Sequence, residues 1–95
     1  MLSFTVRMRF DDADHDAIKG HLIALTEGSR KEPGCVSYIP HFISDDSNTV
    51  LIYEQYTDEA ALEAHRNTPH FKEHAIGGLY QRMRERSMES LTAVA

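Results

Sequence analysis

Apolar and polar residues alternate without interruption over the first ten residues of the chain. A repeat of two residues is the pattern of a β-strand with one buried face, so we expect a half-buried strand here. The side of this strand that faces the protein interior is expected to carry Leu2, Phe4, Val6, Met8 and Phe10.

An acidic segment and a helical repeat follow the first strand. Residues 11–14 are Asp-Asp-Ala-Asp, which suits a helix N-terminus because the helix dipole favours negative charge there. Ile18, Leu22 and Leu25 then recur at helical spacing. We expect this helix to end near Arg30, ahead of the Pro-Gly pair that stops it.

Two further apolar runs, at residues 36–43 and 49–57, flank a short polar segment and predict a β-hairpin. The second run is apolar on both faces, as Ile52 on one face and Tyr53 on the other illustrate. A strand of that kind is covered on both sides. The helices of this chain can cover one side, and a chain of 95 residues has nothing left for the other.

The last third of the chain predicts two helices and a strand. Asp58 is placed to cap a short helix, and Thr68 is placed to cap the next one. We expect Gly77-Gly78 to close this second helix. After a turn or short helix, a strand over residues 87–93 is expected to complete the fold.

The order of these elements is β-α-β-β-α-β, within one domain that spans residues 1–95. This is the order of the ferredoxin-like α+β fold, an antiparallel four-stranded sheet with helices on one face. The other face would be bare and apolar, and so small a domain buries only about 60–65% of its unfolded surface by itself. We therefore expect a homodimer that pairs through the open face of the sheet.

Composition excludes several classes of partner. The formal net charge is -5, so the chain lacks the basic face of a nucleic-acid-binding protein, and the arginines at 82, 84 and 86 are interpreted as a solvated surface. Cys35 is the only cysteine, and no intrachain disulfide can form. No signal-peptide pattern and no apolar run of about 20 residues occurs, which predicts a cytoplasmic protein without membrane contact.

Three histidines, His65, His70 and His74, lie in the two predicted helices near the end of the third strand. His70 and His74 are four residues apart, and the run between them matches the H-x-x-E-H pattern of some zinc proteases. That pattern needs a third protein ligand and a fold with a peptide cleft, which this chain does not supply, so we expect no metal site. If these histidines have no role in catalysis or binding, we expect His70 to be a capping or packing residue and His74 to be a solvent-facing residue of the helix.

His65 and Glu54 are candidates for proton transfer. His65 lies on the helix face that turns toward the sheet, where it is either a packed core residue or an imidazole that moves protons near neutral pH. Glu54 shares a strand face with Tyr56, and a carboxylate among apolar groups must be paired or have a raised pKa. A structural ion pair, with Arg7 or Arg9 if either reaches that face, and a catalytic carboxylate both fit the pattern.

Several short segments spread over the chain together resemble one known family. They are Glu32-Pro33-Gly34-Cys35, Tyr53-Glu54-Gln55-Tyr56, Asp58-Glu59-Ala60-Ala61-Leu62, His65 and Thr68-Pro69-His70-Phe71. In these segments the chain is similar to the antibiotic biosynthesis monooxygenase family, small cofactor-independent oxygenases typified by quinol monooxygenases. In that family two sheets pack face to face as a homodimer with a barrel-like core.

Haem-degrading proteins share this fold but differ from the chain at their functional positions. They carry an Asn on the first strand, and a Trp and a His ligand on the second helical segment. Here the first strand has no Asn, His65 stands at the Trp position, and Ala75 stands at the ligand position with His74 one residue earlier. Haem degradation is therefore disfavoured. The Asn, Trp and Arg set of polyketide-oxidising members is also incomplete, because the chain has no Trp.

The resemblance implies a cofactor-independent monooxygenase that oxidises a small phenolic or hydroquinone-like substrate with dioxygen, through the deprotonated substrate. The expected catalytic residues are His65 as base or proton shuttle, Glu54 and His70, and the expected substrate-binding residues are Tyr38, His41 and His74. Two alternatives stay open. One is an isomerase of a small hydroxy-ketone or lactone that uses His65 with Glu54, and the other is a non-catalytic dimer that binds a small aromatic ligand.

Overall fold

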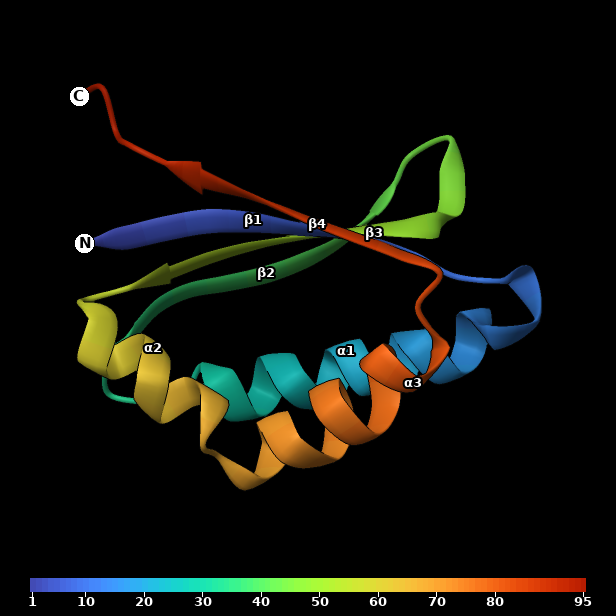
Figure 1. Cartoon of the computed structure of the whole chain (residues 1–95), viewed down its shortest axis with the longest axis horizontal. Coiled ribbons are helices and arrows are strands. Elements are labelled where there is room, and N and C mark those ends of the chain that lie inside the picture. Colours follow the sequence, from blue (N-terminus) through green and yellow to red (C-terminus); the bar gives the residue numbers. More distant parts are fainter.

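The structure, a computed structural model that describes all 95 residues, is built on a four-stranded antiparallel sheet (Figure 1). The strands are β1 (Leu2–Arg9), β2 (Cys35–Ile43), β3 (Asp46–Tyr56) and β4 (Glu85–Leu91). Their spatial order is β2-β3-β1-β4, so β1 and β3 are the central pair. This is the ferredoxin-like order, and the α+β fold predicted from the sequence is confirmed.

Helices cover only one face of this sheet (Figure 1). They are the 3-10 turn η1 (Asp12–Asp14), α1 (His15–Ser29), α2 (Glu59–Arg66), the π-helix η2 (Phe71–Leu79) and α3 (Tyr80–Arg82). Within this layer α1 packs alongside η2. None of the helices is long and apolar enough to cross a membrane.

The core lies between the sheet and the helical layer. The alternating residues of β1 supply Phe4, Val6 and Met8, each at most 5% exposed, as the opening pattern of the chain predicted. Burial of one large apolar side chain contributes roughly 1.5–3 kcal/mol to stability. The other large members of the core are Phe10, Ile18, Leu22, Leu25, Tyr38, Val50, Ile52, Tyr56, Leu62 and Leu79.

The outer face of the sheet is uncovered. On this face Ile39 of β2 lies opposite Tyr53 of β3, and His41 lies opposite Leu51. Ile39 is 42% exposed, whereas Ile52, which points to the other side of β3, is 2% exposed. This chain therefore covers only one of the two apolar faces of β3.

Gly77 and Gly78 do not end a helix, contrary to the prediction. The π-helix η2 runs through both glycines and continues into α3. A Cβ atom at residue 78 would lie 2.8 Å from the imidazole ring of His21 on α1, so the glycine lets the two helices approach closely. Neither glycine has the positive φ of a helix C-cap. The feature interpreted as a helix stop is a packing contact.

The acidic segment before α1 also differs from the prediction. It forms the turn η1, and no acidic side chain caps α1. Its carboxylates instead make ion pairs with the C-terminal arginines: Asp14 lies 2.6 Å from Arg82, and Asp11 lies 2.5 Å from Arg84. Two of the three arginines that we interpreted as solvated therefore tie the end of α3 and the connection to β4 to the start of the helical layer.

Two close contacts fix the corner between α1, β2 and α2. Asp58 caps α2 as predicted, because its carboxylate accepts a hydrogen bond from the N–H of Ala61 at 2.8 Å. Gly34 packs so tightly on Ala61 that a Cβ atom at residue 34 would collide with the alanine side chain. The corner is thereby held against α2, and Glu32 comes to lie beside the end of that helix.

Candidate active site

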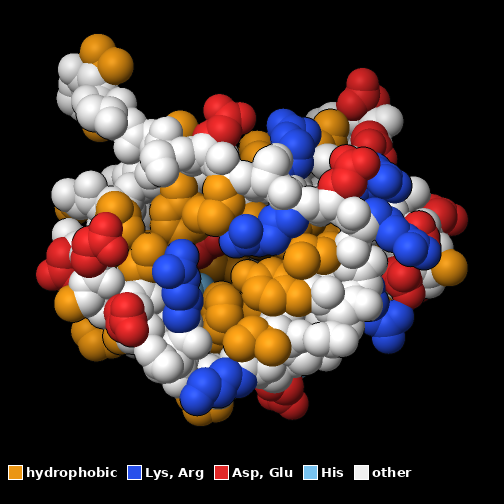
Figure 2. Space-filling model, viewed as in Figure 1, with side chains coloured by type: hydrophobic (Ala, Val, Ile, Leu, Met, Phe, Trp, Pro, Cys, Tyr) orange, Lys and Arg blue, Asp and Glu red, His pale blue; other side chains and the backbone are white.

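A cavity lies between the inner face of the sheet and the α2–η2 segment. Its volume is about 40 Å³, and 12 of its 16 lining residues are hydrophobic. Figure 2 shows the hollow bordered by hydrophobic side chains, with acidic and histidine side chains inside it and Lys or Arg side chains at its rim. The four lining residues that are not hydrophobic are Glu54, His65, Arg66 and Arg86. Apolar walls with a few convergent polar groups are typical of a ligand site.

Three separate elements bring His65, His70 and Glu32 together. His65 lies in the last turn of α2, His70 directly precedes η2, and Glu32 lies in the corner between α1 and β2. The Nδ1 atom of His65 is 3.0 Å from Oε2 of Glu32, and the Nε2 atom of His70 is 2.5 Å from the same oxygen. One carboxylate therefore accepts hydrogen bonds from two imidazoles.

The bond to Glu32 decides which nitrogen of His65 is available for chemistry. Because the carboxylate accepts at Nδ1, the neutral imidazole carries its proton there, and Nε2 keeps a lone pair. Nε2 lies 3.8 Å from Oε1 of Glu54, which lines the cavity. The side chain of His65 is only 3% exposed. A basic nitrogen of fixed orientation, on a side chain with little exposure to solvent, therefore faces the cavity beside Glu54.

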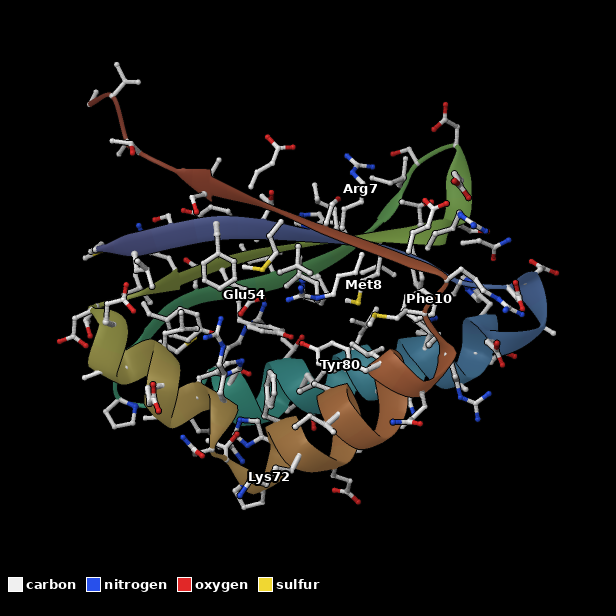
Figure 3. All side chains as sticks on the ribbon, in the orientation of Figure 1. Arg7, Met8, Phe10, Glu54, Lys72 and Tyr80 are labelled. Carbon is white, nitrogen blue, oxygen red and sulfur yellow. The ribbon has the colours of Figure 1, made fainter.

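Glu54 lies on β3 between the sheet and the helices (Figure 3). The hydroxyl of Tyr56, two residues along on the same face, donates a hydrogen bond to its Oε1 at 2.7 Å. The pairing with Arg7 or Arg9 considered from the sequence does not occur. Both arginines point to the outer face of the sheet, and Arg9 pairs there with Glu85.

Burial changes the acidity of both proton-carrying groups in the cavity. It raises the pKa of Glu54 to about 7, although the hydrogen bond from Tyr56 and the charges of Arg66 and Arg86 oppose the shift. Burial also lowers the pKa of His65, against the hydrogen bond and charge of Glu32. A carboxyl group that titrates near neutral pH thus lies beside an imidazole held in its neutral form, an arrangement that suits general acid–base chemistry.

Four of the six residues predicted for the site lie in or next to this cavity. Glu54, His65 and Tyr38 line it, and the ring centroids of Tyr38 and His65 are 5.9 Å apart. His70 does not line the cavity, and its connection to it runs through the carboxylate of Glu32. His70 is thus placed to support His65 rather than to touch a ligand.

The other two predicted residues, His41 and His74, lie elsewhere. His41 is on the outer face of the sheet, with its Nδ1 atom 3.1 Å from the carbonyl oxygen of Leu51. His74 faces α1, where its Nδ1 atom is 2.9 Å from that of His21. Neither residue lines the cavity, so the fold does not bring them to the site of His65.

Several residues of the site were not predicted as such. Tyr56 carried a usable signal, because strand alternation places it on the same face as Glu54. Glu32 belongs to one of the segments that resemble the family, but nothing in its position before a Pro-Gly helix stop indicated contact with His65. Arg86 lies next to Met8 across the β1–β4 pairing, and it was interpreted as part of a solvated cluster.

The group Glu32, His65 and His70 is also the place where a metal ion could be held. One donor atom from each side chain lies within 4.8 Å of the others, and two imidazoles with a carboxylate are a common donor set for zinc or iron. Donors bound to one such ion at about 2.1 Å are separated by about 3 Å or more. The 2.5 Å separation between His70 and Glu32 is shorter than this and is that of a direct, short hydrogen bond.

Comparison with known proteins identifies the family. A model of the antibiotic biosynthesis monooxygenase family matches residues 1–75, well over half of the chain. The chain belongs to the antibiotic biosynthesis monooxygenase family. The matched residues include Glu32, Glu54, His65 and His70 and end before Arg86, so the family match covers the acid–base groups of the cavity but only part of its rim.

Individual similar proteins show the extent of the likeness. The chain is 41% identical over 59 residues to "Uncharacterized protein sll1783" of Synechocystis sp. and 34% identical over 55 residues to "Putative monooxygenase Rv0793" of Mycobacterium tuberculosis. It spans only 40% and 54% of the length of these two relatives. The structure of PA3566 from Pseudomonas aeruginosa is 31% identical and has a TM-score of 0.89, covering 99% of this chain and 94% of that one.

The structure adds to the comparison with haem-degrading proteins of this fold. Ala75, which the resemblance in the sequence places at the position of their haem ligand, lines the cavity and is 3% exposed. His74, one residue earlier, points to His21 on α1 instead. The cavity of this family member therefore has no histidine on η2 that could ligate a haem bound in it.

Proposed function

We propose that this chain is a cofactor-independent monooxygenase that oxidises a small phenolic or hydroquinone-like substrate with dioxygen. The observation that carries the proposal is the orientation of His65, whose Nδ1 atom is bonded to Glu32 while Nε2 faces the cavity beside Glu54. A carboxylate that holds an imidazole in this way fixes its tautomer and stabilises the imidazolium that forms when the ring takes a proton.

The proposed reaction begins when Nε2 of His65 removes the proton of a phenolic hydroxyl. The electron-rich anion reduces dioxygen from a ring carbon, a carbon–oxygen bond forms, and the imidazolium protonates the resulting peroxide. The carboxylate of Glu54 then takes the proton from that ring carbon, and the oxygen–oxygen bond breaks. One oxygen atom stays as a quinone carbonyl, and the other leaves as hydroxide and takes the proton from Glu54 to give water. Substrate and dioxygen thus yield a quinone and water.

The cavity is too small for an aromatic ring, so the substrate must reach it from a larger neighbouring space. About 40 Å³ accommodates dioxygen or a water molecule but not an aromatic ring. A neighbouring groove of about 500 Å³ shares Phe4, Leu62, Arg66 and Met88 with the cavity. We propose that a substrate ring enters from this groove when the exposed side chains of Arg66 and Met88 rotate, a fast motion for surface residues.

Oxygen uptake tests the proposed function. Chelator-treated protein is expected to consume one dioxygen molecule per hydroquinone oxidised, at a rate that adding back a divalent metal does not change. The measurement uses an oxygen electrode together with quinone absorbance, after subtraction of the autoxidation rate. No quinone is expected to form under nitrogen. Turnover that needs an added metal, or that continues at an unchanged rate without oxygen, would contradict the proposal.

An isomerase of a small hydroxy-ketone or lactone is the second candidate. It is supported by the 3.8 Å separation between His65 Nε2 and Glu54 Oε1, because two proton carriers beside one carbonyl suffice for a proton shift. Such a reaction would be indifferent to dioxygen. The nitrogen experiment therefore separates the two candidates. Binding of an aromatic ligand without turnover under either gas would point to a non-catalytic protein.

We also propose that the chain acts as a homodimer, paired through the outer face of its sheet. Support comes from the apolar side chains that this face leaves partly open, among them Ile39, Leu51 and Tyr53. A second copy offers the same surface, as a two-fold symmetric interface requires. Sedimentation is expected to give about twice the chain mass of 10.8 kDa.

A substitution pair tests this dimer. Leu51→Asp puts a charge into the proposed interface and is expected to give a monomer, because an unpaired carboxylate is costly to bury. Ile23→Asp, at a 50% exposed position of α1 on the helical side, serves as the matched control and is expected to leave the mass unchanged. A monomeric wild-type protein at micromolar concentration would refute the proposal.

A further inference from the structure

We infer that Arg66 and Arg86 form an anion-binding subsite at the mouth of the cavity, which selects an aromatic substrate carrying a carboxylate beside its phenolic hydroxyl. The inference rests on the proposed function for the identity of the reacting ring. It goes further by assigning the rim of the cavity to a second, charged part of the substrate.

The two arginines belong to elements that face each other across the opening. Arg66 is the last residue of α2, and Arg86 lies on β4, the strand at the edge of the sheet. Both line the cavity, and Arg66 also lines the adjoining groove. Figure 2 shows positively charged side chains at the rim of the hollow, with hydrophobic side chains around them. Any ligand that passes from the groove into the cavity therefore passes a guanidinium group.

Neither arginine has an acidic partner within ion-pair distance. Arg9, Arg82 and Arg84 each pair with a carboxylate, whereas Arg66 makes no side-chain hydrogen bond at all. Arg86 contacts the sulfur of a methionine at 3.2 Å and lies 5.6 Å from the centroid of the Tyr80 ring.

The carboxylate inside the cavity interacts with these cations only through space and makes no ion pair with either. Glu54 is the only acidic residue among those that line the cavity, and its Oε1 already accepts a hydrogen bond from Tyr56. Glu59 lines the groove but makes no ion pair with Arg66. The mouth of the cavity therefore presents two guanidinium groups without an ion-pair partner, each with a planar set of donors that matches a carboxylate.

Such a subsite would also orient the substrate. A carboxylate held at the mouth leaves the aromatic ring directed toward the apolar walls and its hydroxyl toward the inner end, where His65 and Glu54 lie. Holding the substrate at two points in this way replaces free rotation by one reactive arrangement. An alternative role for the arginines is to stabilise the phenolate itself, which any phenolic substrate would share.

Binding measurements under nitrogen test the subsite without relying on turnover. The probes are 2,5-dihydroxybenzoate and its neutral methyl ester, titrated calorimetrically into the wild-type protein and into the Arg66→Gln and Arg86→Gln variants. We expect the acid to bind at least 10-fold more tightly than the ester, and each variant to lose about 10- to 100-fold in affinity for the acid alone. Raising the salt concentration is expected to weaken binding of the acid only.

Controls separate a local contact from a general effect of charge or folding. Lys72→Gln removes the same charge from an exposed residue on the outer side of the helical layer and is expected to bind both probes as the wild type does (Figure 3). Arg86→Lys keeps the charge and is expected to recover part of the affinity for the acid. Phenyl phosphate competes with the acid if the subsite accepts anions generally, and fails to compete if it is selective for carboxylates.

The outcomes for the subsite and for the proposed function are distinguishable. Equal affinity for acid and ester in the wild type would overturn the inference, even if hydroquinone still consumed oxygen. The inference would also be overturned if the arginine variants lost the same affinity for both probes. It would be overturned as well if these variants turned over the ester more slowly but bound the acid as tightly as the wild type does. Tight, arginine-dependent binding of the acid with no oxygen uptake by any substrate would support the subsite and refute the monooxygenase.

Discussion

The variant His65→Gln is expected to lower kcat/KM for a hydroquinone substrate by about 100- to 10,000-fold, the usual contribution of a positioned general base. The structural reason is that Nε2 of His65 is the one imidazole nitrogen that faces the cavity, with its tautomer fixed by Glu32. Glutamine keeps a polar side chain of similar length but cannot take the proton. Oxygen uptake at saturating and limiting substrate gives kcat and kcat/KM separately.

Two companion variants define what a loss of activity would mean. His74→Gln makes the same change at a histidine that faces α1 instead of the cavity, and it is expected to stay within about threefold of the wild type. Glu32→Gln removes the charge that raises the pKa of His65. Its pH profile is therefore expected to move to lower pH, which a purely structural role for Glu32 would not produce. Retention of wild-type kcat/KM by His65→Gln would remove His65 from the mechanism.

The variant Glu54→Gln is expected to gain stability relative to the wild type as the pH rises. Burial raises the pKa of Glu54 from 4.5 to about 7, so between these values the folded protein binds more protons at this site than the unfolded chain. The stabilising effect of that proton is complete below pH 4.5 and is lost as the pH rises through 7. At 1.36 kcal/mol per pKa unit, the free energy of unfolding of the variant is expected to rise by about 3 kcal/mol relative to the wild type.

Urea unfolding of both proteins at pH 4.5 and pH 8 measures this difference. The glutamine amide in the Glu54→Gln variant can still accept the hydrogen bond from Tyr56, so the comparison isolates the charge of the carboxylate. Glu63→Gln, at an exposed position of α2, is the control and is expected to differ from the wild type by less than about 0.5 kcal/mol at either pH. A difference between Glu54→Gln and the wild type that is the same at both pH values would show that Glu54 is not desolvated.

Local patterns predicted most of the elements of this fold because their physical causes are local. Strand alternation placed Phe4, Val6 and Met8 in the core, and the structure confirms all three. The cap at Asp58 is confirmed too, because it depends only on a carboxylate three residues before a free N–H. The helix stop expected at Gly77-Gly78 is wrong, because a glycine that ends a helix and one that admits a neighbouring helix look the same in a sequence.

The candidate site was only partly visible in the sequence. His65 and Glu54 could be proposed because each is a polar residue on the buried face of its own helix or strand, and Tyr38 was proposed as a strand residue with a polar group. The structure places all three at the cavity. Glu32 could not, because its role depends on the contact of Gly34 with α2, between segments far apart in the chain. His41 was proposed as a polar residue of a strand, but the sequence pattern of a strand does not tell which of its two faces lies next to a cavity. His41 lies on the outer face.

The sequence by itself determined the order of the strands and helices, the buried face of each and the family to which the chain belongs. The elements and their buried faces follow from the spacing of neighbouring residues, and the family follows from short sequence motifs. Both can be read without knowing which segments meet in the folded protein. Only the tertiary structure decided that Glu32 orients His65, that Glu54 becomes a weak acid near pH 7, and that two arginines stand unpaired at the mouth of the cavity. Hydrogen bonds, desolvation and the absence of an ion-pair partner depend on which segments meet, and packing alone sets that.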